Sequence, residues 1–186
     1  MIPALIITAV VVLIPLAYAL VIYNRFVSLK QHLKDSWHGI QVELQRRYDL
    51  IPNLVETAKG YAAHERETLE KVVELRNKAM SNQGSPASQS GDESALGAAL
   101  GKLFAIAEGY PDLKADALFL NLQNELANTE DRIAATRRFY NGNCREINTL
   151  AKQFPSNLIA GLAKVEHADY FDVPDEAVRS APKIEL

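Results

Sequence analysis

The chain has a single cysteine, Cys144, so no disulfide can form within it, which agrees with a reducing compartment. Its four histidines are scattered, without the H-E-x-x-H or Glu-x-x-His spacing that zinc helices and di-iron bundles use. Glycine-rich motifs that bind phosphates are also missing. We therefore expect no catalytic residues, no metal and no cofactor, and a function other than catalysis.

The sequence also lacks an excess of basic residues and a pattern typical of strands. The 20 basic and 23 acidic residues leave a net charge of -3, which gives no electrostatic reason to expect nucleic acid as a partner. After Tyr23 the sequence lacks the alternation of β-branched residues that marks strands. The chain is therefore predicted to be all-α.

Residues 1–24 contain no charged side chain and no histidine. The apolar run Ile2–Tyr23 is long enough to cross a bilayer, which requires about 20 residues, and too long for a helix buried in a soluble core. A cleaved secretory signal is the alternative, because Ala17–Ala19 resembles a cleavage site. Since no basic residue precedes the apolar run, we expect an uncleaved single-pass anchor in the cell (inner) membrane of a bacterium.

Basic residues follow the apolar run but do not precede it. Arg25, Lys30 and Lys34 outnumber the nearby Asp35, so the positive-inside rule predicts an external N-terminus and a cytoplasmic domain. We expect three parts: a transmembrane anchor at 1–24, a helical-bundle domain at 25–166, and an acidic tail at 167–186 that contains two prolines.

Apolar residues recur every 3.6 positions from Phe26 to Ala62, which predicts one long helix that continues the membrane span. A second long helix is predicted from Leu113 to Phe154. Shorter helices are predicted from His64 and from about Asp92, separated by a mobile Ser/Gly-rich loop at 82–94. These lengths predict an elongated antiparallel four-helix bundle.

Polar residues cluster at two places in the predicted helices. Pro52 interrupts the helical hydrogen bonds, and Asp49 precedes it where a cap could restart the helix. The late helix is rich in asparagine, a poor helix former. These residues form a solvated face, a polar network between helices, or a groove for a partner segment. The candidate interaction residues are Arg46, Arg47, Asp49, Pro52, Asn53, Asn121, Asn124, Glu125, Asn128, Arg138, Tyr140 and Asn141.

Two strings carry a family resemblance. RRYDLIPNLVETAKGYAAHE at 46–65 and LQNELANTEDRIAATRRFYNGNCREINTLAKQFPSNLIAG at 122–161 resemble the signature segments of the LemA family. The resemblance implies a single-pass membrane protein with an antiparallel helical bundle. It implies no biochemical activity and transfers no catalytic residue.

Three functions follow from this sequence. The first is a membrane-anchored scaffold or adaptor that binds other membrane or membrane-associated proteins. The second is a membrane-remodelling or oligomer-forming structural protein, for which a homo-oligomer is expected. The third is an enzyme with an unrecognised site around Arg46, Arg47, Asp49 and the asparagines of the late helix. We expect the first.

Overall fold

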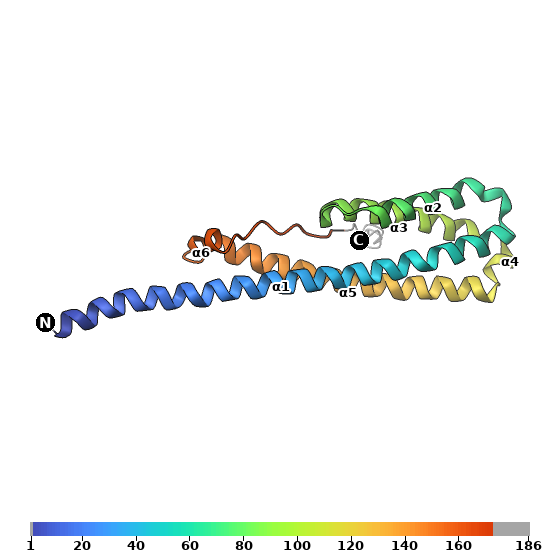
Figure 1. Ribbon diagram of the computed structural model, residues 1–186. Coiled ribbons are helices and arrows are strands. Elements are labelled where there is room, and N and C mark those ends of the chain that lie inside the picture. The colour runs from blue at the N-terminus through green and yellow to red at the C-terminus, as the bar shows by residue number, and fades with distance from the viewer. Residues whose placement is uncertain (1, 173–186) are drawn as a thin grey trace, which may run out of the picture. The chain divides into compact units, whose positions relative to one another are not determined.

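The computed structural model describes residues 2–172, and all regular secondary structure within that range is helical (Figure 1). This confirms the all-α prediction. In chain order the elements are α1 (Ile2–Tyr61), the 3₁₀ turn η1 (Ala63–Glu65), α2 (Arg66–Ser81), α3 (Pro86–Ala107), α4 (Pro111–Lys114), α5 (Ala117–Lys152) and α6 (Asn157–Leu162).

Helix α1 is a single element of 60 residues, so the apolar N-terminal segment is continuous with a helix of the bundle, as predicted. Within the described residues, it is the one helix long and apolar enough to cross a membrane. Its apolar side chains Val11, Ile14 and Val21 are exposed, whereas those of a core helix would be buried. Pro52 does not divide the helix, as the unbroken apolar period predicts, so no helix restarts at Asp49.

The described chain forms two compact units. The first unit combines the described residues up to Gly39 with Arg138–Asp169. The second unit combines Ile40–Arg137 with the described residues from Tyr170 onward. Helices α1 and α5 each contribute one part to each unit.

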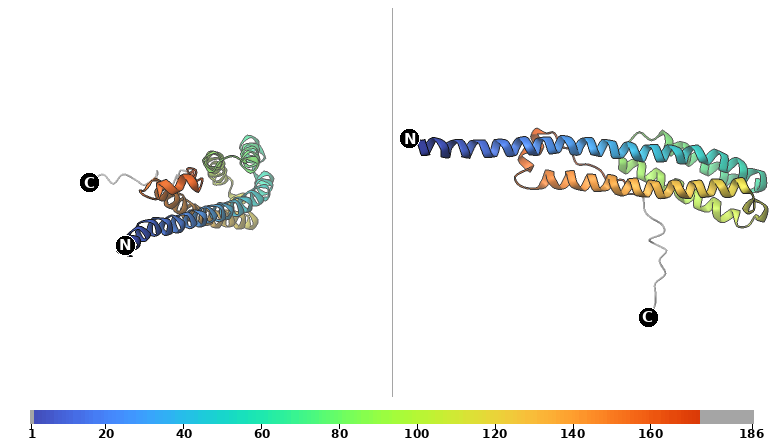
Figure 2. Two further views of the ribbon diagram at one scale, coloured as in Figure 1. Left: turned by 60° about the vertical axis from the view of Figure 1, so that its left-hand side comes forward. Right: turned by 90° about the horizontal axis from the view of Figure 1, so that it is seen from below.

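The second unit is a four-helix bundle made by α2, α3, the later part of α1 and the earlier part of α5 (Figure 2). Tyr61 donates a hydrogen bond to Asp116 (2.9 Å), whereas Arg46 pairs with Glu125 (3.2 Å), so α1 and α5 are antiparallel. Leucine and isoleucine side chains fill the core, among them Ile51, Leu54, Leu96, Leu103 and Leu113.

The first unit pairs the earlier part of α1 with the later part of α5, again antiparallel. Arg25 pairs with Glu146 at 3.0 Å, and Asn143 donates to the Ser36 hydroxyl at 3.1 Å. Helix α6 and the extended chain that follows it complete this unit.

The predicted mobile loop at 82–94 is wrong, because α3 already begins at Pro86. The Ser85 side chain accepts a hydrogen bond from the Ser88 N–H and caps this helix, and proline suits its first turn. The inward positions in the first turns of α3 carry the polar residues Gln89 and Glu93, so no apolar period marks this part of the helix.

The ends of the late helix also differ from the prediction. Asp116 accepts a hydrogen bond from the Phe119 N–H (2.8 Å) and starts α5 at Ala117 instead of Leu113. The helix ends at Lys152 rather than Phe154. In the predicted acidic tail, Ala168 and Phe171 are buried, and residues 173–186 lie outside the described part of the chain.

Candidate functional site

Arg47 lies in the interior of the second unit, with only 4% of its surface exposed. Its Nη1 lies 3.2 Å from Oε2 of Glu93, which is 1% exposed. Its Nε lies 2.9 Å from Oε1 of Glu130, but the N–H does not point at that oxygen, so this contact is an ion pair without a hydrogen bond. Arg47 thus joins α1 to α3 and α5.

Glu93 receives two further hydrogen bonds. The Tyr48 hydroxyl donates to Oε1, and the Gln89 amide donates to the same oxygen at 2.9 Å. Burial raises the pKa of Glu93, while the bond from Tyr48 and the charge of Arg47 oppose this rise. Burial and the adjacent Glu93 carboxylate raise the pKa of Tyr48, so its hydroxyl stays protonated and serves as a donor. We call Arg47, Tyr48, Gln89, Glu93 and Glu130 the Arg47 cluster.

Pro52 has no N–H, so the carbonyl of Tyr48, four residues earlier, loses its helical hydrogen bond. The Nε–H of Arg76, on α2, donates to this carbonyl at 3.0 Å. The backbone at Pro52 is thus satisfied by a residue of another helix. Pro52 therefore creates an acceptor through which α2 is attached to α1.

The residues predicted around this position are not all part of the cluster. Arg46 forms an exposed ion pair with Glu125 at 3.2 Å. Asp49 is exposed and accepts a hydrogen bond from Gln45 of its own helix (2.8 Å), so it does not restart a helix. Pro52 itself is exposed, as are the asparagines predicted as network members, namely Asn53, Asn121, Asn124 and Asn128.

The remaining predicted residues belong to the first unit. Tyr140 is buried, packs against Trp37 with ring centroids 5.4 Å apart, and donates its hydroxyl to the Asp169 carbonyl at 2.9 Å. Burial raises the pKa of this hydroxyl, which keeps it neutral. Arg138 is exposed and Asn141 is half-buried.

Asn148, which sequence analysis did not select, binds the backbone of the extended C-terminal segment. Its amide nitrogen donates to the Ala168 carbonyl at 2.9 Å, and its oxygen accepts from the Ala168 N–H at 2.9 Å. Cys144 lies one turn earlier, fully buried, with its Sγ 3.4 Å from the Asp169 carbonyl. Side chains of α5 thus replace a neighbouring strand as hydrogen-bond partners of this segment.

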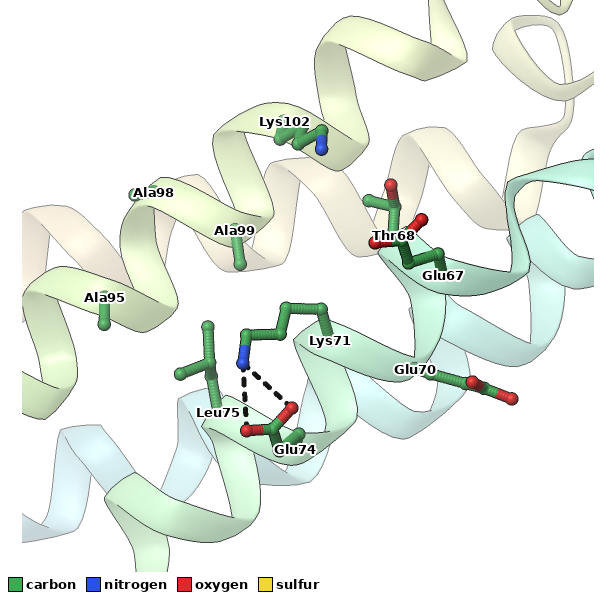
Figure 3. A pocket seen from close by; sticks show the side chains of 10 residues that line it. All are labelled: Glu67, Thr68, Glu70, Lys71, Glu74, Leu75, Ala95, Ala98, Ala99 and Lys102. Carbon is green, nitrogen blue, oxygen red and sulfur yellow. Dashed lines mark hydrogen bonds and ion pairs between the residues drawn. The ribbon is translucent and has the colours of Figure 1, made fainter.

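The second unit has an open groove of about 520 Å³ between α2 and α3. Figure 3 shows small side chains of α3 facing the longer, charged side chains of α2 across it. Lys71 is paired with Glu74 at 2.9 Å, so the groove contains charges of both signs. Its lining residues are Glu67, Thr68, Glu70, Lys71, Glu74, Leu75, Ala95, Ala98, Ala99 and Lys102.

Sequence reasoning missed Glu93, Gln89, Arg76 and Asn148. A signal for the first two was present. Leu96, Leu100 and Leu103 are spaced by three or four residues along one face of the helix. The same spacing, continued towards the N-terminus, places positions 93 and 89 on that inward face. No comparable periodic signal identifies Arg76 as the partner of a carbonyl 28 positions earlier.

The fold and the interior define this chain as a helical-bundle protein whose first helix carries one candidate membrane span and whose second unit encloses a buried ion-pair cluster. The chain belongs to the LemA family, whose profile matches residues 36–186.

Curated relatives agree with this assignment. Magnetosome protein MamQ 1 of Paramagnetospirillum magneticum is 25% identical over an alignment of 181 residues, and the match covers 84% of this chain and 66% of that protein. Magnetosome protein MamQ of Magnetospirillum gryphiswaldense is 24% identical over 174 residues, covering 80% and 64%. Protein LemA of Metamycoplasma hominis is 32% identical over 137 residues, covering 74% and 63%. The chain thus spans just under two thirds of the length of these relatives.

Proposed function

We propose that this protein is a membrane-anchored scaffold or adaptor. The apolar part of α1 crosses the bilayer once, and the bundle offers its surface to other membrane or membrane-associated proteins. The observation that carries the proposal is the continuity of α1, which joins an exposed apolar segment to a core helix of the bundle without a break. A helix without a break holds the folded units close to the membrane.

The Arg47 cluster supports a role without catalysis. Its members Arg47, Tyr48, Gln89 and Glu93 are buried and hydrogen-bonded to one another, and the exposed Glu130 is paired with Arg47. A catalytic acid, base or nucleophile must reach its substrate, and these groups face each other instead. Their arrangement serves to join α1, α3 and α5.

The α2–α3 groove is the surface that we propose for a partner protein. It is open to solvent, and the small side chains Ala95, Ala98 and Ala99 allow close approach of a partner segment. Charged residues of α2 along the other wall can orient that segment.

Co-purification tests this role with a matched pair of variants. Ala98→Trp fills the groove, whereas Ala105→Trp adds the same bulk at an exposed position of α3 outside it. A partner recovered from detergent-solubilised membranes should be lost with Ala98→Trp and kept with Ala105→Trp. Identical recovery with wild type and both variants would argue against the groove, and the absence of any partner would argue against the scaffold role.

For topology we propose an external N-terminus and a cytoplasmic bundle, because Arg25, Lys30 and Lys34 follow the apolar run. A protease site inserted in the short connection 82–85 should be cut in inside-out vesicles and resist protease added to intact cells. Cleavage in intact cells would indicate the opposite orientation, with the bundle outside.

Oligomer formation is the alternative. Cross-linking in native membranes distinguishes the two: a ladder of homo-oligomers that survives Ala98→Trp would favour a structural assembly, and monomers with a captured partner would favour the adaptor.

A further inference from the structure

Three apolar side chains near the end of α5 and in α6 are the most exposed large apolar groups among the side chains that the structure describes, which exclude residues 2 and 4–9. Phe154 is 82% exposed, Leu162 74% and Leu158 68%. All three belong to the first unit, which also contains the candidate membrane span. On the surfaces of soluble proteins such residues occur singly, whereas a local group of them indicates a contact surface.

Leu158 and Leu162 lie on one face of α6, because they are four residues apart. The opposite side of α6 carries Ala160, which is buried within the first unit. Lys30 of α1 donates to the carbonyls of Ala163 and Lys164 at 3.0 and 2.9 Å, which fixes the end of α6 against α1. The apolar face is therefore held in a defined orientation.

The pairing of α1 with α5 sets the level of this surface along α1. Arg25 pairs with Glu146, and α5 continues from there to Lys152, which is about 9 Å further towards the apolar end of α1. Accordingly, Ile22 is buried on the side that faces the rest of the unit, while its neighbour Val21 is exposed. Figure 2 shows α5 ending beside the apolar part of α1.

A span of about 20 residues within Ile2–Tyr23 reaches the surface of the bilayer near Tyr23. By the same rise per residue, the last turn of α5 ends about 6 Å to the bilayer side of Tyr23, which is a depth that interfacial segments reach. Basic side chains occur in the same unit: Lys152 and Lys164 are exposed, and Arg145 lines a groove of about 390 Å³ together with Arg25, which is paired with Glu146. Basic residues at this depth suit anionic lipid headgroups, and lysine stems can lie along apolar surface with the charge in water.

We propose that Phe154, Leu158 and Leu162 form a second membrane contact, in which the α5–α6 turn and α6 rest in the headgroup region of the bilayer beside α1. The partner is the lipid surface itself. An amphipathic segment buries its apolar face about 5–10 Å into the boundary between headgroups and acyl chains. This inference rests on the proposed membrane span of α1.

Fluorescence quenching by lipids tests the contact in the full chain. The chain is reconstituted into vesicles of phosphatidylcholine and phosphatidylglycerol, with an environment-sensitive dye on a single introduced cysteine. Leu158→Cys reports on the proposed contact, and Leu13→Cys reports on the span. Phe139→Cys is the matched control, because Phe139 is also an exposed apolar residue of α5 but lies about 20 Å from Lys152. Cys144 is fully buried, so the unchanged chain measures background labelling.

The dye at position 158 should shift its emission to the blue and be quenched by lipids that carry a spin label near the headgroup. The dye at position 13 should be quenched by a spin label near the bilayer centre, and the dye at position 139 by neither. If position 158 behaves like position 139 while position 13 is quenched, the lipid contact is wrong and the span stands. A blue shift at position 158 without lipid quenching would assign the surface to a contact with a second copy of the chain and overturn the inference. Loss of quenching at position 13 would instead refute the span.

Discussion

The two units bury polar groups in different ways. The second unit encloses charges: Arg47 and Glu93 meet between helices and join three of them. The first unit encloses neutral groups: Asn148 and Tyr140 bind backbone atoms of a segment that is not helical. Buried charge therefore joins three helices in the second unit, whereas in the first unit a buried amide and a buried hydroxyl attach an extended chain to α5. The difference matters because a buried charge left without its partner costs far more than a buried amide.

The largest effect is expected from Arg47→Ala. It leaves the Glu93 carboxylate buried without its cation, which should lower the free energy of unfolding by about 3–5 kcal/mol. The neighbouring Arg46→Ala removes an exposed pair and should cost less than about 1 kcal/mol. Denaturant unfolding of the full chain in mild detergent measures both. Equal losses for the two variants would show that the buried pair contributes no more than the exposed one.

Asn148→Ala should come second, with a loss of about 2–3 kcal/mol, because the N–H and carbonyl of Ala168 both lose their partner. The loss should be local, so hydrogen exchange at the Ala168 amide should accelerate more than exchange in the second unit. Thr149→Ala, at an exposed position of the same helix, is the control. Unchanged protection of Ala168 would contradict the role of Asn148.

A double-mutant cycle tests whether Arg76 and Pro52 act together in the second unit. Arg76→Met removes the donor to the Tyr48 carbonyl and should cost about 1–2 kcal/mol. In a Pro52→Ala background, the new N–H can bond to that carbonyl within α1, so the same change should cost about 1 kcal/mol less. Additive costs would mean that the two residues act independently.

The pH dependence should differ between the units as well. The pKa of Glu93 is raised in the folded state above its ordinary value of 4.5 by burial, so its contribution to stability is complete below that pH and is lost as the pH rises through the raised pKa. The stability of wild type relative to Glu93→Gln should therefore fall as the pH increases above 4.5. Stability relative to Asn148→Ala, which removes a neutral group, should show no such slope. Unfolding curves at several pH values measure both differences.

The smallest effect is expected from Asp49→Ala. The helix does not restart here, and Asp49 only accepts a bond from Gln45 at the surface, so the loss should stay within about 0.5 kcal/mol. Exposed Glu67→Ala provides the comparison. A loss above 1 kcal/mol for Asp49→Ala alone would restore the capping role that the sequence suggested.

The sequence predicted the helices because apolar spacing follows the buried face of each one. Ile51, Leu126 and Ile147 are buried where the period of 3.6 places them. The pattern failed where the inward face is polar, so the first turns of α3, with Gln89 and Glu93, were taken for a loop. At the start of α5, Phe119 is buried and its neighbour Leu118 is exposed.

The candidate site was less accessible to sequence reasoning. Arg47 and Tyr140 were selected with the segments that resemble the LemA family, and both prove to be buried. The asparagines were selected because they are unusual in a helix, yet Asn121, Asn124 and Asn128 are exposed. Partners such as Arg76 and Asn148 depend on distances between segments far apart in the chain, which periodicity does not encode.

The two hydrogen bonds between Asn148 and Ala168 affect which substitutions each of these positions tolerates during evolution. They bind the main chain of Ala168, which every residue except proline can offer, and they bind nothing in its side chain. The identity of residue 168 is therefore constrained by the small volume available to it and by the need for an N–H, while Asn148 is constrained by its own chemistry. Related chains should vary more freely at 168, among small residues, than at 148.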